Sequence, residues 1–207
     1  MIDRFTRAVR QSDGSFAPPS IDLWLLPQSF LTGGGEATVA GLAGDVGYDS
    51  PSFALLLQVG YILALTRKRK YGLSASTLRV IDLVDSAAGP GSVEETERTE
   101  ALQATLTEAR IEAEIKVVFA KLPPSAGAAS IQSGGAQQLG EHVNSVIKSH
   151  SSTTVVSMMH LVRPPSEGAS VDQCGDYIEN LAALTNGLPI SMLVATGQQE
   201  SIITTQI

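Results

Sequence analysis

Short apolar runs recur along the chain between longer stretches of mixed character. They occupy residues 20–26, 77–84, 114–119, 153–159 and 190–196. The runs are almost continuously apolar and do not alternate between apolar and polar positions. That pattern is typical of strands buried on both faces of a parallel sheet.

Between these runs, apolar residues recur three and four positions apart, which is the spacing of one helical face. Leu102 and Leu106 belong to one such stripe, which runs to about Ala113, and the next two stripes lie at 139–147 and 177–184. Because strands and helices alternate, we expect a three-layer α/β domain with a mostly parallel, five-stranded, Rossmann-like sheet. A turn at 197–199 leads into residues 201–207, which we expect to form an added antiparallel edge strand. Ser92 and Glu95 have the spacing of a capping box, and Asn186-Gly187 that of a helix end.

The segment that begins at Ser50-Pro51 is apolar nearly all round. Its dense apolar part, residues 53–65, is shorter than the roughly 18–20 residues of a membrane span, so we expect a buried helix. A helix without a polar face is covered on both sides, by its own sheet and by a partner domain, a second subunit or the preceding loop. The basic run 67–70 either complements the helix dipole or contacts an acidic partner or anionic lipid. The candidate interface residues are Phe53, Leu55, Leu56, Val59, Ile62, Arg67, Lys68 and Arg69.

The remaining segments set the domain boundaries. Residues 1–19 are expected to be an N-terminal linker or tail, and residues 20–207 one α/β domain. Two stretches interrupt it as flexible insertions: the Gly-rich residues 27–50 and the Pro-, Gly- and Ser-rich residues 122–136.

Composition excludes several classes of function. The 207-residue chain has a net charge of −7, which disfavours nucleic-acid binding. Charged residues are 17% of the chain, against about 25% in an average soluble domain, so an unusually large share is available for burial. The single cysteine excludes an internal disulfide framework, and we expect Cys174 to be a small buried or half-buried residue.

The residues that catalysis requires do not occur in recognisable patterns. No Walker-type phosphate loop and no G-x-S-x-G elbow is present, and Gly33-Gly34-Gly35 opens no helix after the first strand. The three histidines, at 142, 150 and 160, share no metal-ligand spacing. Residues 89–92 are expected to form a turn and helix cap, with an anion site as the alternative, and the carboxylates at 94–100 a solvated helix face. We therefore predict a non-enzymatic domain without a cofactor or metal.

Several blocks, in order along the chain, resemble the second half of the C-terminal cytosolic domain of cation–chloride cotransporters. They are Ile21–Leu26, Leu55–Leu57, Tyr61–Leu63, Thr66–Arg69, Leu78–Val80, Glu141–Ser149, Thr154–Met158, Tyr177–Leu181, Leu188–Val194 with Gly197, and Glu200–Thr204. The chain departs from the family at residues 27–49, which replace a short Asp-Gly-Gly turn, and at Gln206-Ile207, which replace a final Tyr-Ser. Its Pro- and Ser-rich loops suggest a divergent branch such as the fungal vacuolar one.

The resemblance implies a fold similar to that of universal stress proteins. It also implies a non-catalytic regulatory and dimerisation domain of a K⁺/Cl⁻ cotransporter on the cytosolic face of a vacuolar or plasma membrane. Its partners would be the transmembrane domain and first cytosolic half of the parent transporter, a second subunit and regulatory kinases. On this interpretation the 207 residues are a soluble part of a longer protein. The alternative is a soluble, nucleotide-binding module like a universal stress protein, although no glycine-rich nucleotide loop follows Met159.

Overall fold

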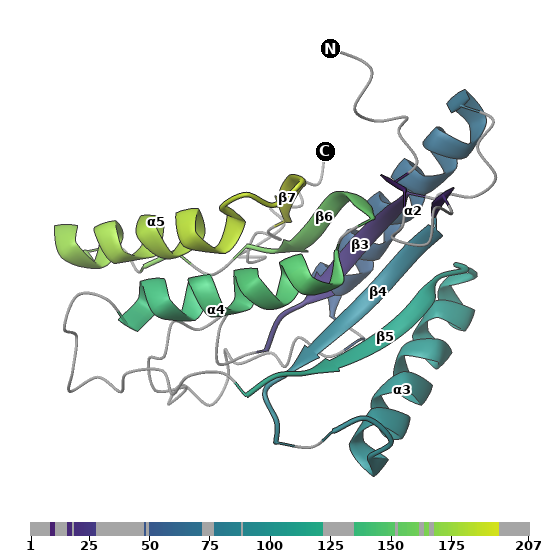
Figure 1. Cartoon of the computed structure of the whole chain (residues 1–207), viewed down its shortest axis with the longest axis horizontal. Helices are drawn as coiled ribbons and strands as arrows, with labels where there is room; N and C mark the ends of the chain where they lie inside the picture. The colour runs from purple at the N-terminus through teal and green to yellow at the C-terminus, as the bar shows by residue number, and fades with distance from the viewer. Residues whose placement is uncertain are drawn as a thin grey trace, which may run out of the picture.

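The fold is seen in a computed structural model of the chain. It describes residues 9–10, 16–17, 19–27, 48, 50–71, 77–87, 89–121, 135–151, 153–161, 164–165 and 168–194. Among these residues the main body is a five-stranded sheet with helices on both faces, so the predicted α/β class is confirmed (Figure 1).

The five strands lie close to the five apolar runs of the sequence. They are β3 (Ser20–Leu25), β4 (Thr77–Val84), β5 (Glu114–Phe119), β6 (Thr154–His160) and β7 (Ile190–Val194). Their order in the sheet is β5-β4-β3-β6-β7, and every pair is parallel. The chain first adds strands on one side of β3 and then crosses to the other side, so β3 and β6 flank the point where the direction of winding reverses.

An antiparallel strand at the edge of this sheet finds no support. The main sheet is entirely parallel among the described residues, and residues 201–207, where that strand was expected, lie outside them. An antiparallel pair does occur elsewhere, between β1 (Val9–Arg10) and β2 (Phe16–Ala17). The sequence analysis assigned this region to a linker because it contains no apolar run.

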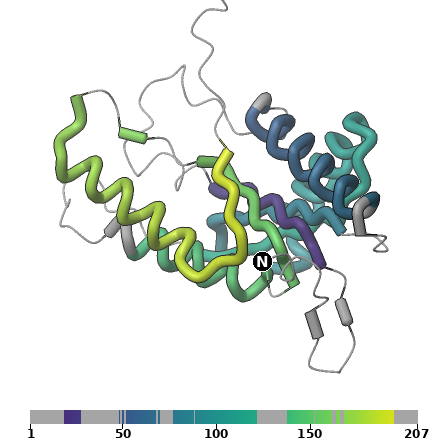
Figure 2. Tube along the Cα trace, turned by 90° about the horizontal axis from the view of Figure 1, so that it is seen from above, coloured from purple at the N-terminus to yellow at the C-terminus, as the bar shows by residue number. Residues whose placement is uncertain are grey.

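Four helices connect the strands of the described core. They are α2 (Pro51–Tyr71), α3 (Val93–Ala109), α4 (Gly135–His150) and α5 (Val171–Thr185). Figure 2 shows α2 and α3 on one face of the sheet and α4 and α5 on the other. None of the helices in the described part of the chain combines the length and the apolar character needed to span a membrane.

Two helix boundaries differ from the sequence expectation. The helix α3 ends at Ala109 and not near Ala113, because Arg110 takes a left-handed conformation with φ of 55° and its N–H bonds back to the carbonyls of Leu106 and Thr107. The helix α5 begins well before Tyr177, at a capping box between Ser170 and Gln173 that the sequence analysis overlooked. At Ser92 the predicted cap is present, but the Glu95 carboxylate accepts from the N–H of Gly91.

The core has two halves, one on each face of the sheet. Alternate residues of β3 point to opposite faces: Ile21 and Leu23 pack under α2 and α3, whereas Trp24 packs under α4 and α5. On the first face α2 lies very close to the sheet, because a Cβ on Gly60 would come within 2.7 Å of the Leu23 Cδ2 atom. Strands buried on both faces explain why the chain can carry few charges.

Candidate functional site

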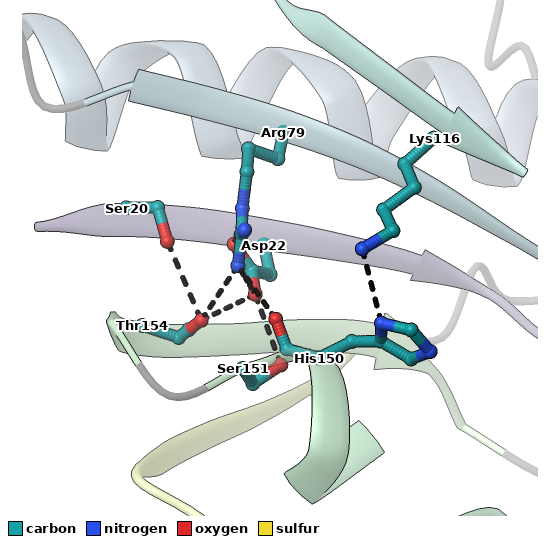
Figure 3. Close-up of polar contacts among 7 residues, drawn as sticks. All are labelled: Ser20, Asp22, Arg79, Lys116, His150, Ser151 and Thr154. Carbon is teal, nitrogen blue, oxygen red and sulfur yellow. Dashed lines mark hydrogen bonds and ion pairs between the residues drawn. The ribbon is translucent and has the colours of Figure 1, made fainter. Parts of the chain in front are cut away.

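A fully buried carboxylate, that of Asp22, lies near the beginning of the central strand β3. The parallel register places Asp22 beside Arg79 of β4. The Arg79 guanidinium donates from Nε to Oδ1 at 2.8 Å and from Nη2 to Oδ2 at 2.6 Å, which is a bidentate ion pair (Figure 3). Burial opposes the charge on Arg79, but these bonds and the charge of Asp22 raise the pKa of the guanidinium.

The segment between α4 and β6 supplies the other donors to Asp22. The Ser151 hydroxyl donates to Oδ2 at 3.0 Å, and the Thr154 hydroxyl donates to the same oxygen. Arg79 Nη2 also reaches the His150 carbonyl at 3.1 Å, so the ion pair holds the end of α4. The Thr154 proton goes to Asp22, so its oxygen accepts at 3.3 Å from the hydroxyl of Ser20. We call Ser20, Asp22, Arg79, Ser151 and Thr154 the Asp22 network.

Beside the Asp22 network, Lys116 of β5 bonds to the last residue of α4. Its Nζ lies 3.0 Å from His150 Nδ1, and the His150 ring is tilted over Trp24 with centroids 6.4 Å apart (Figure 3). Burial lowers the pKa of the His150 imidazole, and the positive charges of Lys116 and Arg79 lower it further.

The position of the Asp22 network indicates a structural role. Asp22, Arg79 and Thr154 lie at the amino ends of their strands, whereas open α/β sheets bind ligands outside the carboxyl ends. The carboxylate of Asp22 is saturated with internal donors, so none of its charge is left for a ligand. The network therefore fastens three strands and one helix end together.

A second polar cluster lies toward the carboxyl end of β4. The Tyr48 hydroxyl donates to the buried Asp82 carboxylate at 2.6 Å, and Arg98 of α3 donates to the same oxygen at 3.1 Å. Arg98 also pairs with Glu94 at 3.2 Å, so two carboxylates compensate its charge. Burial and the Asp82 contact raise the pKa of Tyr48, which keeps the phenol protonated. The cluster joins Tyr48, three residues before α2, to β4 and α3, and the charge of Arg98 within it is compensated.

The last residue of β6, His160, lies at the carboxyl end of a strand that flanks the point where the winding of the sheet reverses. It is buried, and its Nε2 atom has no hydrogen-bond partner among the described residues. Burial lowers the pKa of this imidazole, so the neutral form is favoured. Its position at the carboxyl edge, beside β3 and β7, is where a ligand of an α/β sheet would be sought.

The candidate interface residues on α2 fall into separate environments. Phe53 and Leu56 are fully buried in the core, so they cannot contact a partner while the domain is folded. Arg67 is also buried. The opposite side of α2 exposes Leu55 and Ile62, whose exposed fractions are 38% and 59%.

The other candidate interface residues on α2 are half-buried, exposed, or outside the described part of the structure. Val59 is half-buried against the core, Arg69 is exposed, and the side chain of Lys68 lies outside the described part of the structure. The sequence identified a helix that is apolar all round, but it could not say which side faces the sheet. The exposed candidate surface is therefore the outer face of α2, defined by Leu55 and Ile62.

Two further expectations can be compared with the structure. Cys174 is exposed on α5, so the expectation of a buried or half-buried cysteine was wrong. The error follows from the missed start of α5, since that helix turns Cys174 away from the sheet. His142 is exposed, and no group of three His, Cys, Asp or Glu residues within the described ranges could hold a metal ion.

The Asp22 network is the feature that the sequence analysis missed. Its signal was present as the charged residues Asp22 and Arg79 within the largely apolar runs 20–26 and 77–84. Pairing them requires the register of the two strands, which the sequence pattern alone does not provide.

The comparisons with known proteins do not identify a family for the chain. No protein-family model matches the chain, and no curated protein matches it. A search of solved structures finds, among others, a protein from the universal stress protein family from Burkholderia pseudomallei, with 12% sequence identity and a TM-score of 0.33. That alignment covers 87% of this chain and 98% of the other. At this level of likeness no function transfers, and the resemblance to cotransporters rests on the sequence blocks alone.

Proposed function

We propose that the chain is a non-catalytic regulatory and dimerisation domain of a cation–chloride cotransporter, which acts by packing against other protein surfaces. The observation that carries this proposal is the outer face of α2, where Leu55 and Ile62 are exposed on a helix whose other side is already in the core. Water contact with such side chains is unfavourable by about 25 cal/mol for each Å² of apolar surface. A covering partner removes that cost.

The polar chemistry of the domain supports a packing role over a catalytic one. Both described clusters, around Asp22 and around Asp82, have their charges compensated internally. The ordered sequence blocks supply the proposed parent protein, a K⁺/Cl⁻ cotransporter, with its first cytosolic half, its transmembrane domain and a second subunit as partners.

Self-association of the purified chain tests the dimerisation part of the proposal. We expect sedimentation equilibrium to detect a dimer, and Ile62→Glu to weaken it by about tenfold or more, because a buried charge replaces a central apolar contact. The matched control is Gln103→Glu, which introduces the same charge at an exposed position of α3 and is expected to leave the dimer unchanged. A chain that stays monomeric at every accessible concentration, or an equal loss in both variants, would contradict a dimer through α2.

The second candidate is a soluble nucleotide-binding module, and one observation favours it. His160 places a buried, unpartnered imidazole nitrogen at the carboxyl edge of the sheet, next to the reversal point. Isothermal titration with Mg-ATP separates the candidates. Micromolar binding that is lost in His160→Ala would support the nucleotide-binding module and count against a purely packing role.

A further inference from the structure

The corner between α4 and β6, at His150, Ser151 and Thr154, is attached to three strands through polar contacts. Ser151 and Thr154 bond to Asp22 of β3, and the His150 carbonyl accepts from Arg79 of β4. The contact to β5 is made by the imidazole of His150, which bonds to Lys116. Histidine is the side chain whose ordinary pKa, about 6.5, lies closest to neutral pH. We call His150, Ser151 and Thr154 the α4–β6 corner.

The chemistry of the Lys116 contact fixes the protonation state of His150. A lysine ammonium has three donors and no acceptor, so at 3.0 Å the Nδ1 atom of His150 must be the acceptor. The imidazole is therefore neutral in this arrangement and carries its proton on Nε2. A protonated ring would present a second N–H donor to the ammonium group, and the hydrogen bond could not exist.

The surroundings of His150 offer the cation little compensation. Lys116 of β5 and Arg79 of β4 both act on the ring as positive charges. The nearby carboxylates interact with Arg79 instead. Asp22 of β3 forms an ion pair with Arg79, and the negative charge of Glu114 of β5 raises the pKa of Arg79. The end of the α4 dipole favours a cation at His150, but the burial of the ring and the two positive charges outweigh it, since the pKa is lowered.

We propose that the α4–β6 corner is a pH-sensitive latch, in which protonation of His150 breaks its bond to Lys116 and detaches the end of α4 from β5. The latch is closed while the ring is neutral. When the ring gains a proton, Lys116 turns toward solvent, and the polar contacts of the α4–β6 corner are then limited to β3 and β4. The proposal does not depend on the function proposed above.

The direction of the pH effect follows from linkage. The pKa of His150 is lowered by folding, so the unfolded or opened state binds the proton more tightly than the closed state. The latch contributes fully to the stability of the closed state when the pH is above the ordinary histidine pKa of about 6.5. It is lost progressively as the pH falls below that value toward the lowered pKa of the folded chain.

Amide hydrogen exchange of the full chain tests the latch. Between pH 7.5 and pH 5.5, after correction for intrinsic rates, we expect protection in the last turn of α4 and the first residues of β6 to fall by about threefold or more. His150→Asn should abolish this fall, because the amide oxygen can accept from Lys116 and does not titrate. His142→Asn, at an exposed position of the same helix, should behave as the unmodified chain does.

A second variant keeps the proposal testable if His150→Asn folds poorly. Lys116→Met removes the ammonium group, and the pKa of His150 measured by NMR should rise toward its ordinary value. An unchanged pKa in Lys116→Met, or the same loss of protection in His150→Asn as in the unmodified chain, would overturn the latch.

Discussion

Replacing Asp22 with asparagine is expected to lower the free energy of unfolding by about 3–5 kcal/mol, the range for breaking a buried ion pair by removing one partner. The substitution keeps the shape of the side chain but leaves the Arg79 guanidinium, whose side chain is only 14% exposed, without its counter-charge. The Ser151 and Thr154 hydroxyls lose a charged acceptor as well. Urea unfolding followed by the fluorescence of Trp24, the only tryptophan, measures the change.

Two controls separate the ion pair from the loss of a carboxylate in general. Glu112→Gln removes an exposed carboxylate between α3 and β5 and is expected to change stability by less than about 0.5 kcal/mol. The double variant Asp22→Leu/Arg79→Met replaces the pair with apolar side chains and should recover part of the loss, because no uncompensated charge remains buried. If Asp22→Asn were no more destabilising than Glu112→Gln, the Asp22 network would not hold the strands together as described.

Gly140→Ala is expected to destabilise the domain by about 1–3 kcal/mol, although alanine is the better helix former. At Gly140 the helices α4 and α5 approach closely: a Cβ there would lie 2.8 Å from the backbone oxygen of Asn180 and would also collide with the Asn180 side-chain oxygen. A backbone atom within a helix cannot move aside without displacing the helix. The two helices would therefore have to separate, and thermal or urea unfolding measures the cost.

A second glycine-to-alanine substitution provides a matched control, because its expected effect on stability has the opposite sign. Gly175 lies in α5 with no atom within 4 Å of where its Cβ would be, so Gly175→Ala is expected to stabilise the domain by about 0.5–1 kcal/mol. The difference between the two variants isolates the helix–helix contact from helix propensity. Destabilisation by both substitutions to the same extent would show that close packing at Gly140 is not the cause.

The fold was largely predictable because the three central strands, β3, β4 and β6, are buried over nearly their whole length. Such strands have to be apolar over nearly their whole length, so the signal is local, and all five runs mark strands to within one or two residues. Helix boundaries were less predictable where they depend on one backbone conformation. The left-handed Arg110 that ends α3 is an example, because a residue other than glycine gives no signal for that conformation.

The candidate site was much less predictable, because its parts are far apart in the chain. Asp22 and Arg79 are separated by 57 positions and become partners only through the register of β3 and β4. Likewise His150 at the end of α4 and Lys116 of β5 are 34 positions apart and meet only in the folded chain. A sequence pattern records which residues are apolar, but it does not record which strand lies beside which.

The amino-acid sequence by itself determined the class of this protein: an acidic α/β domain with a parallel sheet, and with one helix too apolar to have a polar face. Only the tertiary structure decided which side of α2 is buried, leaving Leu55 and Ile62 on the outside, and how the buried charges are compensated. The physical reason is that burial of apolar side chains depends on local composition. Pairing of buried charges depends on distances of about 3 Å, which are set only when the strands and helices are packed together.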